Sequence, residues 1–380
     1  MTHFPNIERH AFRRRPVALP DGLESLSPES QAALRQFSPE RLVAYGVARE
    51  DADELLARVA QGDDWRVAAL ALSDRLRAPG PDVAAAAAAG VLFRMSALVR
   101  TSQLMMIEDT AERRQLFARA VELYSAAGAT VGDRTRLTLR GAEGKTLVGW
   151  RFAAAQPVAV AVVWGGIEGW AMDFSAMGEA LAARGIDAYL IDGPGQGETR
   201  LAHGLYFGPD WQLHWRAVVD QVEAGSRGLP LVMVGNSLGG CMAMNYAPRD
   251  PRVCAVCSNG GPLRPPSLAG DLPSKLRKLV VFCGDADARA VWGALDSARE
   301  MARSSRPLLI LHGGADPLVT EAEVLEIAAA AGGEDVRLVI YSDGDHCLYN
   351  HPADKHELIA EWIHAAVCGD RRDDRQIGRA

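Results

Sequence analysis

No run of apolar residues in this sequence is long enough to span a bilayer, and the first ten residues lack the apolar core of a signal peptide. We therefore expect a cytoplasmic protein with no membrane partner. The net charge of −7 is a modest acidic excess for 380 residues, so it gives no reason to expect nucleic acid as a partner either. These absences leave a small molecule as the expected ligand.

Cysteine is scarce, and its six copies are scattered, several of them inside apolar runs. This distribution favours reduced thiols that are buried as small apolar side chains. Cys254 and Cys257 form a C-x-x-C pair, but in a strand a three-residue offset directs two side chains to opposite faces. We therefore expect no metal or redox site. The six cysteines are Cys241, Cys254, Cys257, Cys283, Cys347 and Cys368.

Phosphate-binding motifs are also missing. The glycine-rich segment 191–199 lacks the Lys-Ser/Thr pair of a P-loop and does not fit G-x-G-x-x-G. Nucleotide binding is thus not expected, and the sequence predicts no cofactor of any kind.

The hydrophobic pattern divides the chain into four parts. Residues 1–40 are rich in Arg, Pro and Ser and are predicted to form a solvated N-terminal arm. Residues 41–130 have apolar side chains at three- and four-residue intervals, which predicts an α-helical cap domain. Residues 131–368 are expected to form an α/β catalytic domain, and residues 369–380 a disordered tail.

The predicted α/β domain begins with two alternating segments around a glycine-containing turn, which indicate a hairpin over residues 134–152. Apolar strand-like runs and helical segments then follow in turn, a pattern typical of a mostly parallel sheet flanked by helices. The pattern predicts eight strands. Residues 260–307 are less regular and form an insert that is expected near the site.

A G-x-S-x-G motif follows the apolar run 231–234 and precedes helix-compatible sequence. In this setting it indicates a nucleophile elbow, in which Ser237 has strained backbone geometry between a strand and a helix. Side chains at Gly235 and Gly239 would collide with the neighbouring strand and helix. Because five letters are weak evidence in a glycine-rich chain, the prediction depends on partners for the serine.

A serine hydroxyl needs a base, and the base needs an acid to orient it. His346 follows the last predicted strand, and Asp316 follows the strand before it. In the order Ser, Asp, His, the three residues match the triad of α/β-hydrolases. Asp343 and Asp345 could compete as the acid, although their turn-like surroundings favour a loop role. His312 is more typical of a satisfied loop histidine than of a base.

The tetrahedral intermediate of such a reaction needs backbone N–H donors for its oxyanion. One donor is expected from Leu238, immediately after the serine, and the second from Ile167 in the glycine-rich segment 164–170. The methionines of segment 92–107 fit two hypotheses. Met105 and Met106 either fill the core or line an apolar substrate pocket under a roofing helix.

Together with these residues, the D-x-x-G-x-G-x-T turn at 192–199 makes the chain resemble an α/β-hydrolase over residues 131–368. The helical N-terminal part, the Gly-Gly-Ile-Glu segment and the Gly-Asn-Ser-Leu-Gly-Gly elbow are similar to one subfamily. That subfamily contains 2,6-dihydroxypseudooxynicotine hydrolase, the fungal heptaketide-shortening hydrolases and the FrsA-like proteins. The resemblance implies a helical cap over the site, a homodimer and, for several members, cleavage of a C–C bond next to a carbonyl.

The resemblance further implies that Ser237 attacks a ketone or ester carbonyl, that His346 takes its proton and that Asp316 holds the imidazolium. We expect hydrolysis of a C–C bond or an ester in a small apolar, aromatic or polyketide-like substrate. Acyl transfer or cyclisation, and a FrsA-like binding protein with little turnover, remain alternatives. Candidates for substrate contacts, or for an extra donor to a departing enolate, are Gly166, Glu168, Met105, Met106, Tyr206, Trp211, His203 and Asp271.

Overall fold

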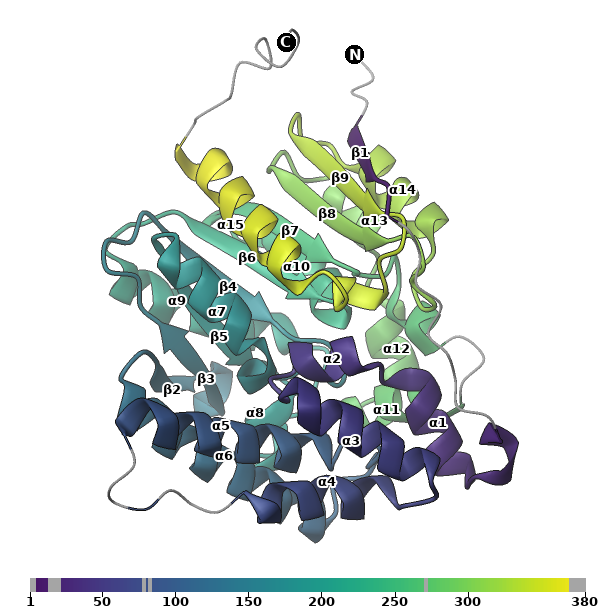
Figure 1. The fold of residues 1–380 in the computed structure, drawn as a ribbon. Coiled ribbons are helices and arrows are strands. Elements are labelled where there is room, and N and C mark those ends of the chain that lie inside the picture. Colours follow the sequence, from purple (N-terminus) through teal and green to yellow (C-terminus); the bar gives the residue numbers. More distant parts are fainter. Residues whose placement is uncertain (1–4, 13–21, 77–79, 81–83, 270–272, 369–380) are drawn as a thin grey trace, which may run out of the picture.

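The computed structural model describes residues 5–12, 22–76, 80, 84–269 and 273–368, so the predicted tail 369–380 lies outside the described residues. Its centre is a nine-stranded sheet of order β1-β9-β8-β7-β6-β4-β5-β3-β2 (Figure 1). All neighbours pair in parallel except β2 with β3 and β3 with β5. This confirms the mostly parallel α/β sheet, with one strand more than predicted. The strands are β1 (Asn6–His10), β2 (Thr135–Arg140), β3 (Thr146–Phe152), β4 (Ala159–Trp164), β5 (Ile186–Asp192), β6 (Leu231–Asn236), β7 (Val253–Asn259), β8 (Leu308–Gly313) and β9 (Val336–Tyr341).

The additional strand, β1, comes from the segment that was expected to be a solvated arm. It pairs in parallel with β9, from Asn6 with Arg337 to His10 with Tyr341. Arg337 donates two hydrogen bonds to Glu8, at 2.6 and 2.8 Å, and the rings of His10 and Tyr341 stack at 4.9 Å. The prediction of a solvated arm is therefore wrong for these residues, which cover an edge of β9 that would otherwise expose unpaired backbone groups.

Helices cover both faces of the sheet (Figure 1). The helices α7 (Ser175–Ala183) and α15 (Pro352–Cys368) pack on one face, and α9 (Trp211–Ser226), α10 (Leu238–Tyr246) and α14 (Glu321–Ala330) pack on the other. Every residue of β4, β5, β6 and β8 is buried. Burial on both faces explains why these strands have continuous apolar runs rather than alternating ones.

A β-bulge interrupts the pairing of β7 with β6. Leu231 pairs with Val253 and Val232 with Ala255, which leaves Cys254 between them without a register partner. The bulge shifts the alternation of side chains by one residue. Cys254 and Cys257 consequently pack against the same apolar cluster, so the expectation of opposite faces is wrong. Both are free thiols.

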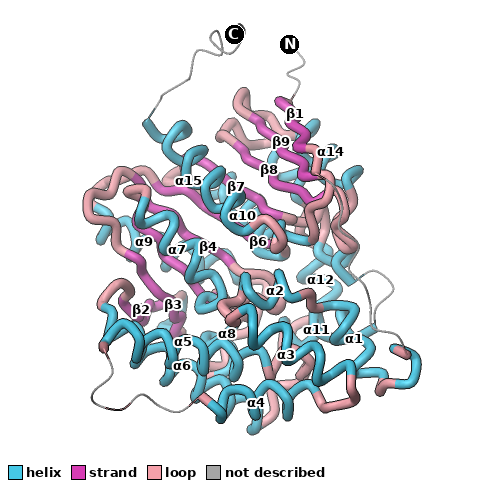
Figure 2. Tube along the Cα trace, viewed as in Figure 1, coloured by secondary structure: helices cyan, strands magenta, loops and turns pink. Residues whose placement is uncertain are grey.

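In the described residues before β2, six α-helices gather on one side of the sheet (Figures 1 and 2). They have an apolar core of their own, which includes Phe37, Trp65 and Leu98. The same core contains Cys347 and Tyr349, so these helices pack against the loop that follows β9. The helical layer begins at Pro28 rather than at residue 41. Its helices are α1 (Pro28–Gln36), α2 (Pro39–Ala44), α3 (Arg49–Ala60), α4 (Trp65–Arg75), α5 (Ala85–Thr101) and α6 (Ala111–Val131).

The segment 260–307, expected to be less regular, contains three α-helices in its described residues: α11 (Pro273–Phe282), α12 (Ala288–Gly293) and α13 (Ser297–Met301). Of these, α11 lies next to the helical layer, because Lys278 donates a hydrogen bond to the carbonyl of Leu104 at 3.0 Å. Among the described residues, the structure contains no helix with the length and apolar character that a bilayer crossing needs.

Candidate active site

Ser237 connects β6 to α10 with φ 55° and ψ −125°. Residues other than glycine rarely adopt this backbone conformation, because it costs about 1–3 kcal/mol. The flanking glycines make it possible: a Cβ at Gly235 would lie 2.2 Å from the carbonyl oxygen of Gly239, and a Cβ at Gly239 would lie 2.6 Å from that of Trp164. The strained elbow and both glycine contacts are as predicted.

The side chains of Ser237, His346 and Asp316 meet at the carboxyl ends of β6, β9 and β8. The distance from Ser237 Oγ to His346 Nε2 is 2.8 Å, and that from His346 Nδ1 to Asp316 Oδ2 is also 2.8 Å. Asp316 Oδ1 accepts hydrogen bonds from the backbone N–H groups of Leu318 and Val319, at 2.8 and 3.1 Å. Because a carboxylate can only accept, His346 carries its proton on Nδ1, and its Nε2 is free to accept one from the serine.

Burial alone would raise the pKa of Asp316, but the adjacent His346 and the two backbone donors outweigh it and hold this pKa below its usual value. For His346, burial lowers the pKa, but the negative charge and hydrogen bond of Asp316, together with the neighbouring Cys347, raise it by more. The net effect is a raised pKa, which makes the neutral imidazole a stronger base toward the serine proton.

The carboxylates that could compete with Asp316 for the role of the acid have other hydrogen-bond partners. Asp343 Oδ1 lies 2.8 Å from His351 Nε2, and Asp345 Oδ1 accepts two backbone N–H groups of the turn that follows. Neither carboxylate bonds to His346. His312 lies inside β8, and among the described residues its Nδ1 has no hydrogen-bond partner. The expectation of a satisfied loop histidine is therefore wrong.

The loop after β4 packs directly against the serine, since a Cβ at Gly166 would lie 3.0 Å from Ser237 Cβ. Gln196, in the glycine-rich turn after β5, holds this loop in place. Its Nε2 donates to the carbonyls of Gly165 and Gly166, at 2.7 and 3.0 Å, and its Oε1 accepts from Gly193 N at 3.0 Å. The turn that the sequence identifies as a family signature thus fixes the loop beside Ser237.

The two predicted oxyanion donors lie in suitable places. Leu238 is the first residue of α10, and Ile167 lines the same pocket as Ser237. The N-terminus of α10 also brings the positive end of a helix dipole to the serine, which suits a developing negative charge. The assignment of these two backbone N–H groups stays a prediction.

Ser237 and His346 open into a pocket of about 420 Å³, part of it open to solvent. Gly166 and Glu168, predicted substrate contacts, line it. So do several residues that the sequence does not single out, because they come from α2, from α11 and from the loop after β9 and meet only through tertiary packing. These are Arg41, Tyr45, Lys275, Lys278 and Tyr349.

Glu168 is bound on several sides. Its carboxylate accepts from Gln36 Nε2 at 2.9 and 2.8 Å and from Arg41 Nη2 at 2.9 Å, and it also contacts Lys278 Nζ. With its oxygens occupied, Glu168 ties the loop after β4 to α1, α2 and α11. Glu168 lines the pocket, but its carboxylate is engaged by the protein itself, and contact with substrate stays a prediction.

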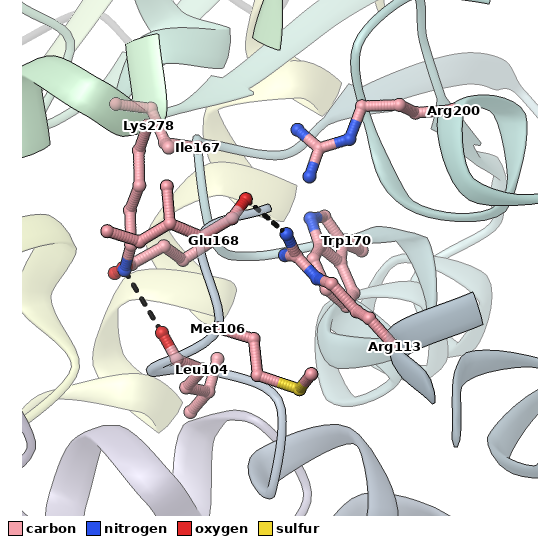
Figure 3. A pocket seen from close by; sticks show the side chains of 9 residues that line it. Leu104, Met106, Arg113, Ile167, Glu168, Trp170, Arg200 and Lys278 are labelled. Carbon is pink, nitrogen blue, oxygen red and sulfur yellow. Dashed lines mark hydrogen bonds and ion pairs between the residues drawn. The ribbon is translucent and has the colours of Figure 1, made fainter. Parts of the chain in front are cut away.

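The two methionines that were predicted as substrate contacts lie in different surroundings. Met106 lines an adjoining pocket that shares Ile167, Glu168 and Lys278 with the first (Figure 3), whereas Met105 packs against the core of the helical layer.

Tyr206 and Trp211, also predicted as substrate contacts, line neither of these two pockets. The Tyr206 hydroxyl donates to Asp109 at 2.9 Å, and Trp211 is buried in the aromatic core with Trp164. His203 is exposed, and Asp271 lies outside the described residues.

Comparisons with known proteins agree with the fold. Residues 155–283 match the family model described as serine aminopeptidase, S33. The 2,6-dihydropseudooxynicotine hydrolase of Paenarthrobacter nicotinovorans is 29% identical over 297 residues, which are 75% of this chain and 78% of the relative. Hydrolase LUC6 of a Fusarium species is 32% identical over 238 residues, 54% of each chain.

Two solved structures resemble most of the chain. The crystal structure of 2,6-dihydroxy-pseudo-oxynicotine hydrolase has a TM-score of 0.73 at 22% identity and covers 87% of this chain and 96% of its own. Wild-type AbyA5 has a TM-score of 0.67 at 19% identity and covers 84% and 90%. With its mostly parallel sheet and its serine elbow, the chain has the fold of an α/β-hydrolase enzyme, and the proteins that it resembles over most of its length are named hydrolases.

Proposed function

We propose that this enzyme is a serine hydrolase in which Ser237 attacks a substrate carbonyl and forms an acyl-enzyme. The observation that carries the proposal is the hydrogen-bonded chain from Ser237 through His346 to Asp316, with both links at 2.8 Å. His346 Nε2 accepts the serine proton, and Asp316 stabilises the imidazolium that results. Backbone N–H groups of Leu238 and Ile167 receive the oxyanion.

His346 then gives its proton to the leaving group, and water attacks the acyl-enzyme to release a carboxylic acid. In a β-diketone the bond that breaks is a C–C bond next to the carbonyl, the leaving group is an enolate and the second product is a ketone. In an ester the leaving group is an alcohol. We place C–C cleavage ahead of ester cleavage because the similarity to 2,6-dihydropseudooxynicotine hydrolase extends along three quarters of the chain.

The lining of the pocket supports a small aromatic or polyketide-like acyl compound as substrate. The rings of Tyr45 and Tyr349 meet edge to face at 5.4 Å, and Leu268 and Leu318 add apolar surface. Flat apolar groups pack well against such walls. The subfamily resemblance also implies a homodimer, which we propose for this chain and which analytical ultracentrifugation tests.

Product analysis tests the proposed reaction. Benzoylacetone and a panel of aryl esters are incubated with the wild-type enzyme and with Ser237→Ala in isotopically labelled water. Formation of an acid and a ketone from the diketone, with label in the acid and no turnover by the variant, is expected. A cyclised or transferred acyl product without label would show that the acceptor is not water. Absence of turnover on every carbonyl substrate would contradict an enzymatic role and favour a binding protein.

A further inference from the structure

The pocket in front of Ser237 contains more positive than negative side chains. Arg41, Lys275 and Lys278 line it, together with one carboxylate, that of Glu168. Arg41 and Lys278 both contact this carboxylate. Of these three cations, Lys275 forms no ion pair with any residue that the structure describes.

Lys275 lies in the first turn of α11 and is only 9% exposed. Its ammonium has no hydrogen-bond partner in the part of the chain that the structure describes. The negative charge of Asp316 acts on it, but the oxygens of Asp316 are engaged by His346 and by two backbone N–H groups. The ammonium remains accessible from the pocket, and a substrate that covered it without supplying an anionic oxygen would bury an unpaired charge, which costs free energy.

The choice of lysine at this site departs from the composition of the chain. Only four of its 41 basic residues are lysines, and two of these four line the pocket. Lysine provides a compact point charge on a flexible stem, whereas arginine provides a rigid planar fork. A compact charge suits contact with a single oxygen atom.

The adjoining pocket has the same sign of charge. Arg113 and Arg200 line it, opposite Lys278 in the close view (Figure 3). Both guanidinium groups share the carboxylate of Asp109, at 3.4 and 3.1 Å, and among the described residues the Nε atom of each has no partner. Positive potential therefore extends from the serine into the neighbouring cavity, which attracts anions.

We propose that Lys275 binds an anionic oxygen of the substrate. The substrate is then either an acyl compound with a carboxylate or a β-dicarbonyl compound whose departing half becomes an enolate. The proposal rests on the proposed function, since it concerns the reaction at Ser237.

In the enolate case, the acyl carbon stays on Ser237 Oγ, and the electron pair of the broken C–C bond moves onto the departing carbonyl oxygen. Lys275 pairs with that oxygen. His346 then delivers the proton that it took from the serine to the α-carbon, which gives a neutral ketone.

Two substrate pairs test the role of Lys275 and distinguish the two sources of the anion. The first pair is a nitrophenyl ester with a free carboxylate at its far end and the methyl ester of that carboxylate. The second pair is benzoylacetone, whose departing half is an enolate, and nitrophenyl acetate, whose phenolate leaves without help. The ratio of kcat/KM within each pair is measured for the wild type, Lys275→Met and Lys275→Arg. A ratio is insensitive to partial loss of folded enzyme.

Lys275→Met is expected to lower one of the two ratios by about 10- to 100-fold, the range for a hydrogen bond to a charged group. A fall in the first ratio identifies a carboxylate, and a fall in the second identifies an enolate. Lys275→Arg keeps the positive charge but not the compact ammonium, so it should lower the affected ratio by less than Lys275→Met does. Lys145→Met, at an exposed position between β2 and β3, is the matched control and should change neither ratio.

Both ratios unchanged in Lys275→Met would overturn the proposal. If a fluorophosphonate still labels Ser237 in that case, only the role of Lys275 fails. If the wild type is neither labelled nor active, the serine-hydrolase function fails with it.

Discussion

Replacing Asp316 with Asn tests which tautomer of His346 the site imposes. In the structure, Asp316 Oδ1 accepts the N–H groups of Leu318 and Val319, and Oδ2 accepts the proton on His346 Nδ1. An asparagine can satisfy the two backbone donors only with its carbonyl oxygen, which turns its NH₂ group toward Nδ1. The ring proton must then move to Nε2, so that Nε2 cannot accept the proton of Ser237.

We expect Asp316→Asn to lower kcat/KM by about 10⁴-fold, or about 5.5 kcal/mol, because the imidazole is held in the wrong tautomer. The fold should persist, since the substitution preserves the shape of the side chain. Initial rates on a nitrophenyl ester and thermal unfolding measure the two effects separately.

Asp343→Asn is the matched control, because Asp343 forms a second Asp–His contact of 2.8 Å, to His351. Its activity should stay within about threefold of wild type. The reasoning is refuted if Asp316→Asn keeps more than about a tenth of the activity. It is also refuted if the control loses as much activity as Asp316→Asn.

Three further predictions follow from the same geometry. Despite burial, Asp316 and Cys347 together raise the pKa of His346 above 6.5, and the protonated ring cannot accept a proton. The value of kcat/KM for a neutral ester should therefore fall as the pH decreases through a value above 6.5. A midpoint clearly below 6.5 in the pH–rate profile would contradict this. Gly235→Ala should lower the free energy of unfolding in urea by about 3 kcal/mol, or prevent folding, since its Cβ would lie 2.2 Å from a backbone oxygen. The control Gly90→Ala, in α5 where a Cβ would have no atom within 4 Å, should be neutral or stabilising by up to about 1 kcal/mol. Similar losses of stability in both variants would refute the steric account. Met105→Ala should lower the free energy of unfolding by about 1 kcal/mol, and Met106→Ala should instead change KM among apolar substrates. The reverse pattern would contradict the placement of Met105 in the core and of Met106 in the pocket.

The sequence predicts the elbow and its two partners because the rules that place them are short in range. The strain at Ser237 demands small residues at 235 and 239, and the whole requirement is written in five consecutive letters. Asp316 and His346 each follow a recognisable buried strand. Because the carboxyl ends of neighbouring parallel strands meet at one edge of a sheet, a prediction of the two strands also predicts that Asp316 and His346 lie close together.

The residues that the sequence does not predict depend on contacts between distant segments. Strand β1 has five residues and no apolar alternation, and it becomes a strand only because β9 offers it an edge. Arg41 and Lys275 reach the pocket because α2 and α11 pack near the same loop. Adjacent residues such as Met105 and Met106 have the same local pattern, and only the packing of the helical layer decides which of them faces a cavity.

Covalent labelling tests the central claim most directly. A fluorophosphonate is reacted with the wild-type protein and with Ser237→Ala, and the adduct is located by peptide mass spectrometry. We predict one adduct, on Ser237 of the wild type, and none in the variant. A wild-type protein that stays unlabelled, or a variant that is labelled equally well at another residue, would contradict a nucleophilic serine at the elbow.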